Sequence, residues 1–276
     1  MFTGTVIQKL CLLLLAGILL VRANAQEHKG NWDAYVVHID HKPVSVVVDL
    51  DFGTSPEAKE KRNVIIVRLN INDVQTDGMP VRSEIRTLDS IENGLANHLK
   101  TVLNAVYTGR YTQNGKRDFY FYSNDTSHYK QHIKTVLQNF SSYTWTVSAS
   151  RDAELGNYLN VLYPTQKEME HMQNRRVVDD LRQRGDALTA PRKVEHYVFF
   201  KTESGRKKFA RVVQDSGFVV ENAGKEMGVK DRPYSLHISR TDKVDYNSID
   251  KVSIYLWETA MRYFGKYDGW ETFVVK

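Results

Sequence analysis

Cysteine is nearly missing from this chain of 276 residues, which contains only Cys11. A single cysteine can form neither an intrachain disulfide nor a zinc site built from several thiolates. Cys11 lies at the start of the N-terminal apolar run and not after a small-residue lipobox at its end, so a lipid-modified cysteine is not expected. We therefore expect apolar cores alone to stabilise the folded units.

Long apolar runs are equally scarce, and the one that exists is N-terminal. Lys9 precedes the apolar residues 10–21, and Ala-Asn-Ala at 23–25 gives a small-x-small cleavage pattern. The run is too short to span a bilayer, which takes about 20 apolar residues. We expect residues 1–25 to be a cleaved secretory signal, the protein to be periplasmic or secreted, and no transmembrane segment to remain; an uncleaved anchor is the alternative.

A strong excess of one charge is also missing. The 38 Lys and Arg residues nearly balance the 33 Asp and Glu residues, for a net charge of +5, and loss of Lys9 and Arg22 with the signal would leave +3. Residues 166–276 hold 21 basic and 17 acidic side chains, against 15 and 16 in residues 26–165. The second half is therefore the better partner for an acidic surface, by a small margin.

Motifs for nucleophilic and nucleotide chemistry are absent from the sequence. It contains no G-x-S-x-G elbow, no Walker loop and no G-x-G-x-x-G. We therefore expect no catalytic residues and no cofactor, and the sequence favours a binding module over an enzyme.

Residues 26–165 have the pattern of an α+β unit. Alternating apolar residues flank a turn expected at residues 41–43, and a third strand is expected at 63–69. Asn114-Gly115 predicts a second hairpin, because both residues tolerate positive φ, and a strand at 143–148 ends the unit. Apolar residues three and four apart predict two amphipathic helices, one through Ile85, Leu88, Ile91, Leu95, Leu99, Val102 and Val106, and one through Ile133, Val136, Leu137 and Phe140.

Three motifs of this half form a recognisable set: Trp32, the hairpin at 109–122, and the closing segment Tyr158 to Pro164. On these motifs, residues 32–164 resemble the bacterial domain-of-unknown-function family 695. Members of that family often close on a Trp a few residues before the tyrosine, whereas residues 152–155 here contain none. The resemblance implies a fold and carries no activity.

A helix is predicted to begin at Gln166 and to end before Gly185, a residue suited to the position after a helix. Met169, Met172, Val178 and Leu181 lie on one side of it. We interpret this stripe as packing on the protein's own domain, with a partner-binding face as the alternative. The domain boundary is placed near Gln166, which gives domains at 26–165 and 166–276, the second beginning with the linker helix.

Residues 192–276 predict the order strand, helix, strand, strand, helix, strand. Strand alternation occurs at 194–200 and 234–238, and the final strand is expected at Trp270–Val275. The order βαββαβ is that of the ferredoxin-like sandwich, in which two helices cover one face of an antiparallel sheet. We therefore predict an α+β protein with two antiparallel-sheet sandwiches, the second ferredoxin-like and the first similar in plan.

Motifs spread over residues 178–276 resemble RraB, the regulator of ribonuclease E activity B. They are Leu181 with Gly185-Asp186, the segment Pro191 to Phe200, Gly217-Phe218, and Gly265 to Glu271. The resemblance implies a non-catalytic inhibitor that binds an endonuclease. Because a secretory signal would separate this chain from a cytoplasmic nuclease, we expect a protein partner other than that one.

Three groups of residues are candidates for partner binding, each with a plainer interpretation. Asp268, Trp270 and Glu271 lie at a turn expected before an edge strand, where the Trp could instead anchor the core. Arg192 and His196 belong to the first strand of the second domain, where the parity of His196 favours a buried core histidine. Arg206, Lys207 and Arg211 form a basic helix face, which is most often only solvated.

Two other functions stay open at this point. A metal-dependent hydrolase could use His128 and His132, four apart on a predicted helix, or the hairpin cluster His38, Asp40, His41, Asp49 and Asp51. An anionic-polymer or nucleic-acid binder could use the basic face, although the near-neutral charge makes nucleic acid a poor partner. The hypothesis favoured by the sequence is an exported, non-enzymatic module that binds a protein partner or regulates it.

Overall fold

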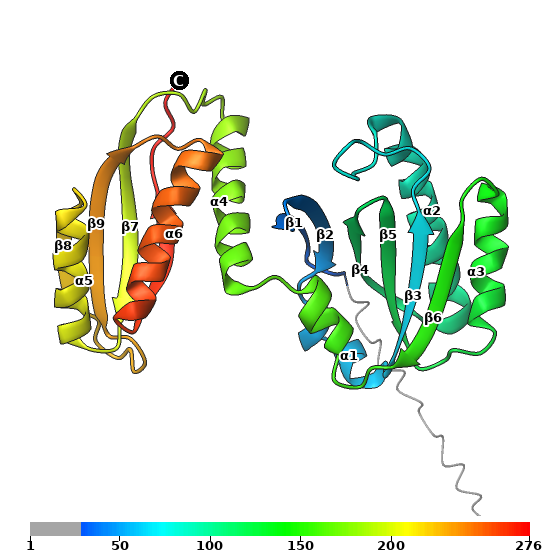
Figure 1. Cartoon of the computed structure of the whole chain (residues 1–276). Coiled ribbons are helices and arrows are strands. Elements are labelled where there is room, and N and C mark those ends of the chain that lie inside the picture. Colours follow the sequence, from blue (N-terminus) through cyan, green and yellow to red (C-terminus); the bar gives the residue numbers. More distant parts are fainter. Residues whose placement is uncertain (1–28) are drawn as a thin grey trace, which may run out of the picture.

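The computed structural model describes residues 29–276, which form two α+β units connected by one helix, α4 (Figure 1). The expected signal segment, residues 1–25, lies outside the described residues. Within the described range, none of the helices combines the length and the apolarity that a membrane crossing requires.

The first unit is built on a six-stranded antiparallel sheet with the order β1-β2-β4-β5-β3-β6. Its strands are β1 (Trp32–Ile39), β2 (Lys42–Asp49), β3 (Asn63–Asn70), β4 (Val106–Gln113), β5 (Lys116–Ser123) and β6 (Trp145–Arg151). Its helices and helical turns are η1 (Phe52–Thr54), α1 (Pro56–Glu60), α2 (Arg82–Leu103), α3 (Tyr129–Leu137), η2 (Gln138–Phe140) and η3 (Tyr158–Leu162).

Both hairpins of this sheet close with two residues in the left-handed region. Asn114 and Gly115 have φ of 49° and 75°, as the sequence predicts. In the first hairpin the turn consists of Asp40 and His41, with φ of 50° and 62°, so the expected turn at residues 41–43 was misplaced. Pro43 could not take part, because its ring fixes φ near −65°, and it lies instead in β2.

The central strands β3 and β5 are buried on both faces. Val67 and Phe121 belong to the core under α2 and α3, whereas Val64 and Tyr122 belong to a second core on the opposite face. The second core is covered by Phe52 of η1 and by Tyr158 and Leu162 of η3, and it includes Met172 of α4. This second layer explains why β5 is apolar or aromatic at four consecutive positions.

The linker helix α4 (Gln166–Gln183) begins with a capping box formed by Thr165 and Glu168. It ends in a Schellman-type turn in which the N–H of Asp186 donates to the carbonyl of Leu181, with Gly185 at φ 90°. Met172 on this helix packs with the first unit, and Val178 and Leu181 pack with the second. The helix is therefore shared between the two units.

The second unit has a four-stranded antiparallel sheet with the order β10-β7-β9-β8. Its elements are β7 (Arg192–Phe200), α5 (Glu203–Asp215), β8 (Val219–Lys225), β9 (Tyr234–Asp242), α6 (Tyr246–Arg262) and β10 (Gly265–Glu271). The last strand pairs with the first, which confirms the ferredoxin-like plan predicted from the sequence.

The final strand begins five residues earlier and ends four residues earlier than the expected Trp270–Val275. Gly265 and Tyr267 pair with Phe200 and Val198 of β7, and a bulge between Tyr267 and Gly269 shifts the register. The bulge puts Tyr267 and Trp270 on the same face although they are three residues apart. The bulge therefore interrupts the alternation of buried and exposed residues by which a strand is recognised in a sequence. Asp268 and Gly269 lie within the strand and not in a turn before it.

Only one face of this second sheet is covered by α5 and α6, whose core contains Val198, Phe200, Phe209, Ile238 and Leu256. The opposite face carries a polar cross-strand network. Lys193 lies 2.8 Å from both Glu195 and Glu221, and the ring of Tyr197 stacks on His237 at 4.7 Å. This face, which we call the open sheet face, remains in contact with solvent.

Candidate functional site

Three of the residues selected from the sequence for partner binding are interior residues. Arg192 forms a buried, two-pronged ion pair with Asp186, with Nη2 donating to Oδ1 at 2.9 Å, and Nη1 donates to the carbonyl of Phe273. Asp186 also accepts from the backbone N–H groups of Leu188 and Val275. The Arg192 guanidinium holds the pKa of Asp186 far below its usual range. This pair fastens the C-terminal segment and is not available to a partner.

His196 is also fully buried, as its parity in β7 indicates. Its Nδ1 lies 2.8 Å from the hydroxyl of Tyr267 on β10. Burial, reinforced by the neighbouring Arg240 and His237, lowers the pKa of His196 to about 3. The imidazole is therefore neutral at neutral pH and is unsuited to transferring protons there.

Trp270 is 8% exposed, and its indole N–H donates to Oδ1 of Asn174 on α4 at 2.8 Å. The amide of Asn174 donates in turn to Asp250 and Ser253 of α6, both at 2.6 Å. Trp270 thus connects β10 to α4 and, through Asn174, to α6. It anchors the core, as the plainer interpretation of the sequence had it.

Four of the other predicted residues, Asp268, Glu271, Lys207 and Arg211, remain at the surface but do not converge. Asp268 pairs with Lys266 at 2.9 Å, and Glu271 accepts from the hydroxyl of Tyr197 on the open sheet face. Lys207 and Arg211 are exposed on α5, with Lys207 paired to Glu203. Arg206 folds back and donates to the carbonyls of Gly224 and Ser235, so the basic face holds one cation fewer than expected.

The structure spreads one candidate metal site along the first hairpin and places the other at the start of α3. His38, Asp40 and His41 lie at the turn of the first hairpin, and Asp49 lies at the opposite end of β2. His128 precedes α3 in the left-handed conformation, so only His132 of that pair lies within the helix. Among residues 29–276, no group of three or more His, Cys, Asp or Glu side chains is arranged to hold a metal ion.

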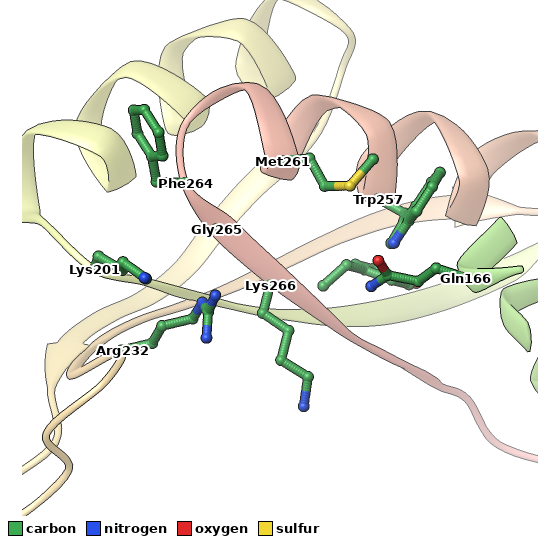
Figure 2. Close-up of a pocket in the computed structure, with 9 residues that line it drawn as sticks. Gln166, Lys201, Arg232, Trp257, Met261, Phe264, Gly265 and Lys266 are labelled. Atoms are coloured by element: carbon green, nitrogen blue, oxygen red, sulfur yellow. The ribbon is translucent and has the colours of Figure 1, made fainter. Parts of the chain in front are cut away.

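The second unit instead presents a pocket of about 410 Å³ where α6 ends and β10 begins (Figure 2). We call it the cationic pocket; it is lined by Gln166, Lys201, Arg232, Trp257, Met261, Phe264, Gly265, Lys266 and Tyr267. In Figure 2, Trp257 and Met261 project from α6 and Gln166 reaches in from α4, with Lys201, Arg232 and Lys266 on the strand side. The linker helix and the second domain therefore build this pocket together.

Charge in the pocket is positive but partly balanced. Lys201 and Arg232 both pair with Asp231, and Lys266 pairs with Asp268. Three lining cations thus meet two acidic side chains at the rim, which leaves a net positive site. Ion pairs as exposed as these contribute only about 0–1 kcal/mol each, so a ligand can replace them at little cost.

Apolar groups at the mouth of the pocket are exposed to an unusual degree. Phe264 is 73% exposed and Met261 is 43% exposed. Phe264 has φ of 58°, the left-handed conformation that often follows a helix C-terminus but that is uncommon for a bulky side chain. The turn between α6 and β10 thus holds an aromatic ring in solvent beside a charged pocket.

A buried carboxyl group lies close to this site. Glu170 of α4 is 7% exposed, and burial raises its pKa to about 7, with Asp268 adding to the increase and Lys266 opposing it. No sequence pattern predicted Glu170 or the pocket residues as a site. The available signal was that Met261 falls outside the core stripe Ile249, Val252, Leu256 and Ala260 of α6.

Comparison with known proteins divides the chain at the linker helix. Residues 30–163 match the model of a family of unknown function, DUF695. Residues 171–272 match the model of the regulator of ribonuclease activity B. No curated protein matches the chain significantly.

Two solved structures show weak overall similarity. One is an unknown protein from Galdieria sulphuraria, with 10% identity and a TM-score of 0.23, covering 78% of this chain and 99% of that one. The other bears the name "putative glycine cleavage system transcriptional repressor", with 8% identity and a TM-score of 0.24, covering 77% of this chain and 99% of that one. At these TM-scores neither structure informs the fold or the function. The family matches, with the two observed sheets, show that the chain joins a DUF695-like domain to a domain resembling the regulator of ribonuclease activity B.

Proposed function

We propose that this protein is an exported, non-enzymatic regulatory module that binds another protein through its second domain, with the cationic pocket and its rim as the contact. The match to a family named for regulating a ribonuclease supports a regulatory role. The signal-like residues 1–25 support export and hence a partner other than a cytoplasmic nuclease.

The single observation that carries the proposal is the exposure of Phe264 and Met261 beside the pocket. Aromatic and methionine side chains are enriched in the centres of protein interfaces, where they supply apolar area. Lysines and an arginine around them supply the polar rim that such interfaces have. A protein surface that covers this mouth would bury both side chains.

Site-specific photo-crosslinking in the producing cells tests this proposal. A photoreactive phenylalanine analogue is placed at position 264, and a matched control carries it at position 85, where Ile85 is 43% exposed on α2 of the first domain. We expect a discrete protein adduct from position 264 in the exported fraction and none from position 85. Equal adducts from both positions, or none from position 264 in a folded protein, would overturn the proposal.

A further inference from the structure

Two buried N–H donors in the cationic pocket have no partner in the described structure. They are Nε1 of Trp257 and Nε of Arg232. Trp257 is 8% exposed, and Figure 2 shows its indole nitrogen directed into the pocket, toward Gln166. Because nearly all buried N–H groups in proteins are paired, unpaired donors on two sides of one pocket indicate that each side lacks an acceptor.

The charges around these donors define the acceptor as an anion. Lys201 and Lys266 lie in the same pocket as Arg232, and lysine and arginine side chains are cations at neutral pH. A guanidinium group favours carboxylate or phosphate oxygens because it offers its N–H donors in a planar fork. An oxyanion near Arg232 would therefore satisfy both charge and hydrogen bonding.

The apolar side chains of the pocket indicate that the ligand also has an apolar part. Met261 and Phe264 are exposed at the mouth, and Trp257 offers its ring inside. A small inorganic anion would leave these surfaces in water, whereas a peptide can place an apolar side chain on them next to its acidic group. The pocket volume of about 410 Å³ accommodates one or two side chains, and not a folded domain.

The acidic rim argues against a polyphosphate chain. Asp231 and Asp268 flank the three cations. A nucleic acid strand would carry a phosphate charge at every nucleotide past these carboxylates, whereas a peptide with one or two acidic residues would not.

We infer that the cationic pocket binds an acidic peptide segment of the partner protein, with a carboxylate on Arg232 and Lys266 and an adjacent apolar side chain against Trp257, Met261 and Phe264. The inference rests on the proposed function, because the partner supplies the segment. It adds the chemistry by which the partner is recognised. The indole N–H of Trp257 donates to a second oxygen of the segment.

Fluorescence anisotropy with the purified chain tests this inference. The probe is a fluorescein-labelled peptide Gly-Glu-Phe-Glu-Leu-Gly, and the comparison peptide has Gln in place of each Glu. We expect the Glu peptide to bind at least about tenfold more tightly, the difference produced by one good charge-assisted contact. Equal binding of the two peptides would overturn the inference, as would tighter binding of a decathymidine oligonucleotide.

Three substitutions locate the binding. Lys266→Glu and Arg232→Gln should each weaken binding of the Glu peptide by about tenfold or more, and Trp257→Phe should weaken it severalfold because the ring stays and the N–H is lost. Lys207→Glu makes the same charge change at an exposed position of α5 that does not line the pocket, and should leave binding unchanged. A loss with Lys207→Glu equal to that with Lys266→Glu would show general charge attraction and would refute the pocket.

Thermal unfolding of each variant confirms that it is folded. If Trp257→Phe does not fold, Lys266→Glu still tests the inference, because the Lys266 side chain is 58% exposed and its substitution should not disturb the core.

The proposed function and the acidic-segment inference fail in different experiments. Crosslinking at position 264 without binding of the Glu peptide would retain the partner and refute the acidic segment. Specific peptide binding without any crosslinked protein would retain the pocket chemistry and refute the regulatory contact.

Discussion

The two sheets differ in how many of their faces are covered. In the first unit, α2 and α3 cover one face, and η1, η3 and Met172 cover the other. In the second unit, α5 and α6 cover one face, while the open sheet face stays polar and solvated. The first sheet is thus shielded from solvent on both faces, whereas the second leaves one polar face in water.

The largest effect is expected from substitutions in the cores, which test whether the two units unfold independently. Phe121 and Phe209 are both fully buried, one in each unit. Phe121→Ala should lower the free energy of unfolding of the first unit by about 3–5 kcal/mol, and Phe209→Ala should do the same in the second. Hydrogen exchange read by mass spectrometry should show lost protection in α2 for the first variant and in α6 for the second. Equal losses in both helices from either variant would show one cooperative unit and break the comparison.

A smaller effect tests the second layer of the first unit. The hydroxyl of Tyr158 donates to the carbonyl of Asp49 at 2.7 Å in a fully buried position. Tyr158→Phe should lower the free energy of unfolding by about 1 kcal/mol or slightly more, because the carbonyl loses a partner. Tyr163→Phe is the matched control, since Tyr163 is only half-buried, and should change stability by less than about 0.5 kcal/mol. Urea denaturation measures both, and identical results would mean that the hydroxyl does not fasten η3.

The smallest effect depends on pH and concerns Glu170, which lies where α4 packs beside β10. Burial raises the pKa of Glu170 from 4.5 to about 7, so the folded state binds its proton more tightly than the unfolded state. Its stabilising contribution is complete below pH 4.5 and is lost as pH rises through about 7. Glu170→Gln should therefore raise Tm at pH 8 by about 2–4 °C, corresponding to about 1 kcal/mol in a chain of this size, and change little at pH 4.

Glu258→Gln on α6 provides the control for this measurement, because the Glu258 side chain is 42% exposed and pairs with the exposed Lys167 at 3.4 Å. Its Tm should follow the unaltered protein at both pH values. If Glu170→Gln lowered Tm at pH 8, the ionised carboxylate would be stabilising the folded protein, and folding would lower the pKa of Glu170 instead of raising it.

Much of the fold could be predicted because local patterns agree with the packing. Of the predicted stripe, Leu88, Ile91, Leu95 and Leu99 are fully buried, whereas Ile85 is exposed and Val106 lies beyond the helix, at the start of β4. Asn114-Gly115 forms the expected turn. The parity of His196 in β7 indicated the buried position that it occupies. Where a residue's role depends on its nearest neighbours in the chain, the sequence was sufficient.

The pocket could not be predicted, because its parts come from five separate segments. Gln166, Lys201, Arg232, Trp257 and Lys266 are brought together only by the pairing of β10 with β7 and by the position of α4. The bulge at Asp268 concealed the start of β10, and the second layer over β2 depended on η3, which follows β6 by several residues. Contacts between segments that are far apart in the chain produce no periodic pattern of apolar residues from which they could be predicted.

One hydrogen bond of the linker helix has a consequence for self-association. β1 is an outer strand of the first sheet, and the guanidinium of Arg175 donates to the carbonyl of Ala34 on that strand, while Arg176 pairs with Asp33 beside it. An uncovered outer strand offers its backbone as a template on which another molecule can add a strand. Because α4 occupies part of that edge, less of β1 is open to edge-to-edge pairing, and a substitution that frees the Ala34 carbonyl is expected to lower solubility before it lowers the stability of the fold.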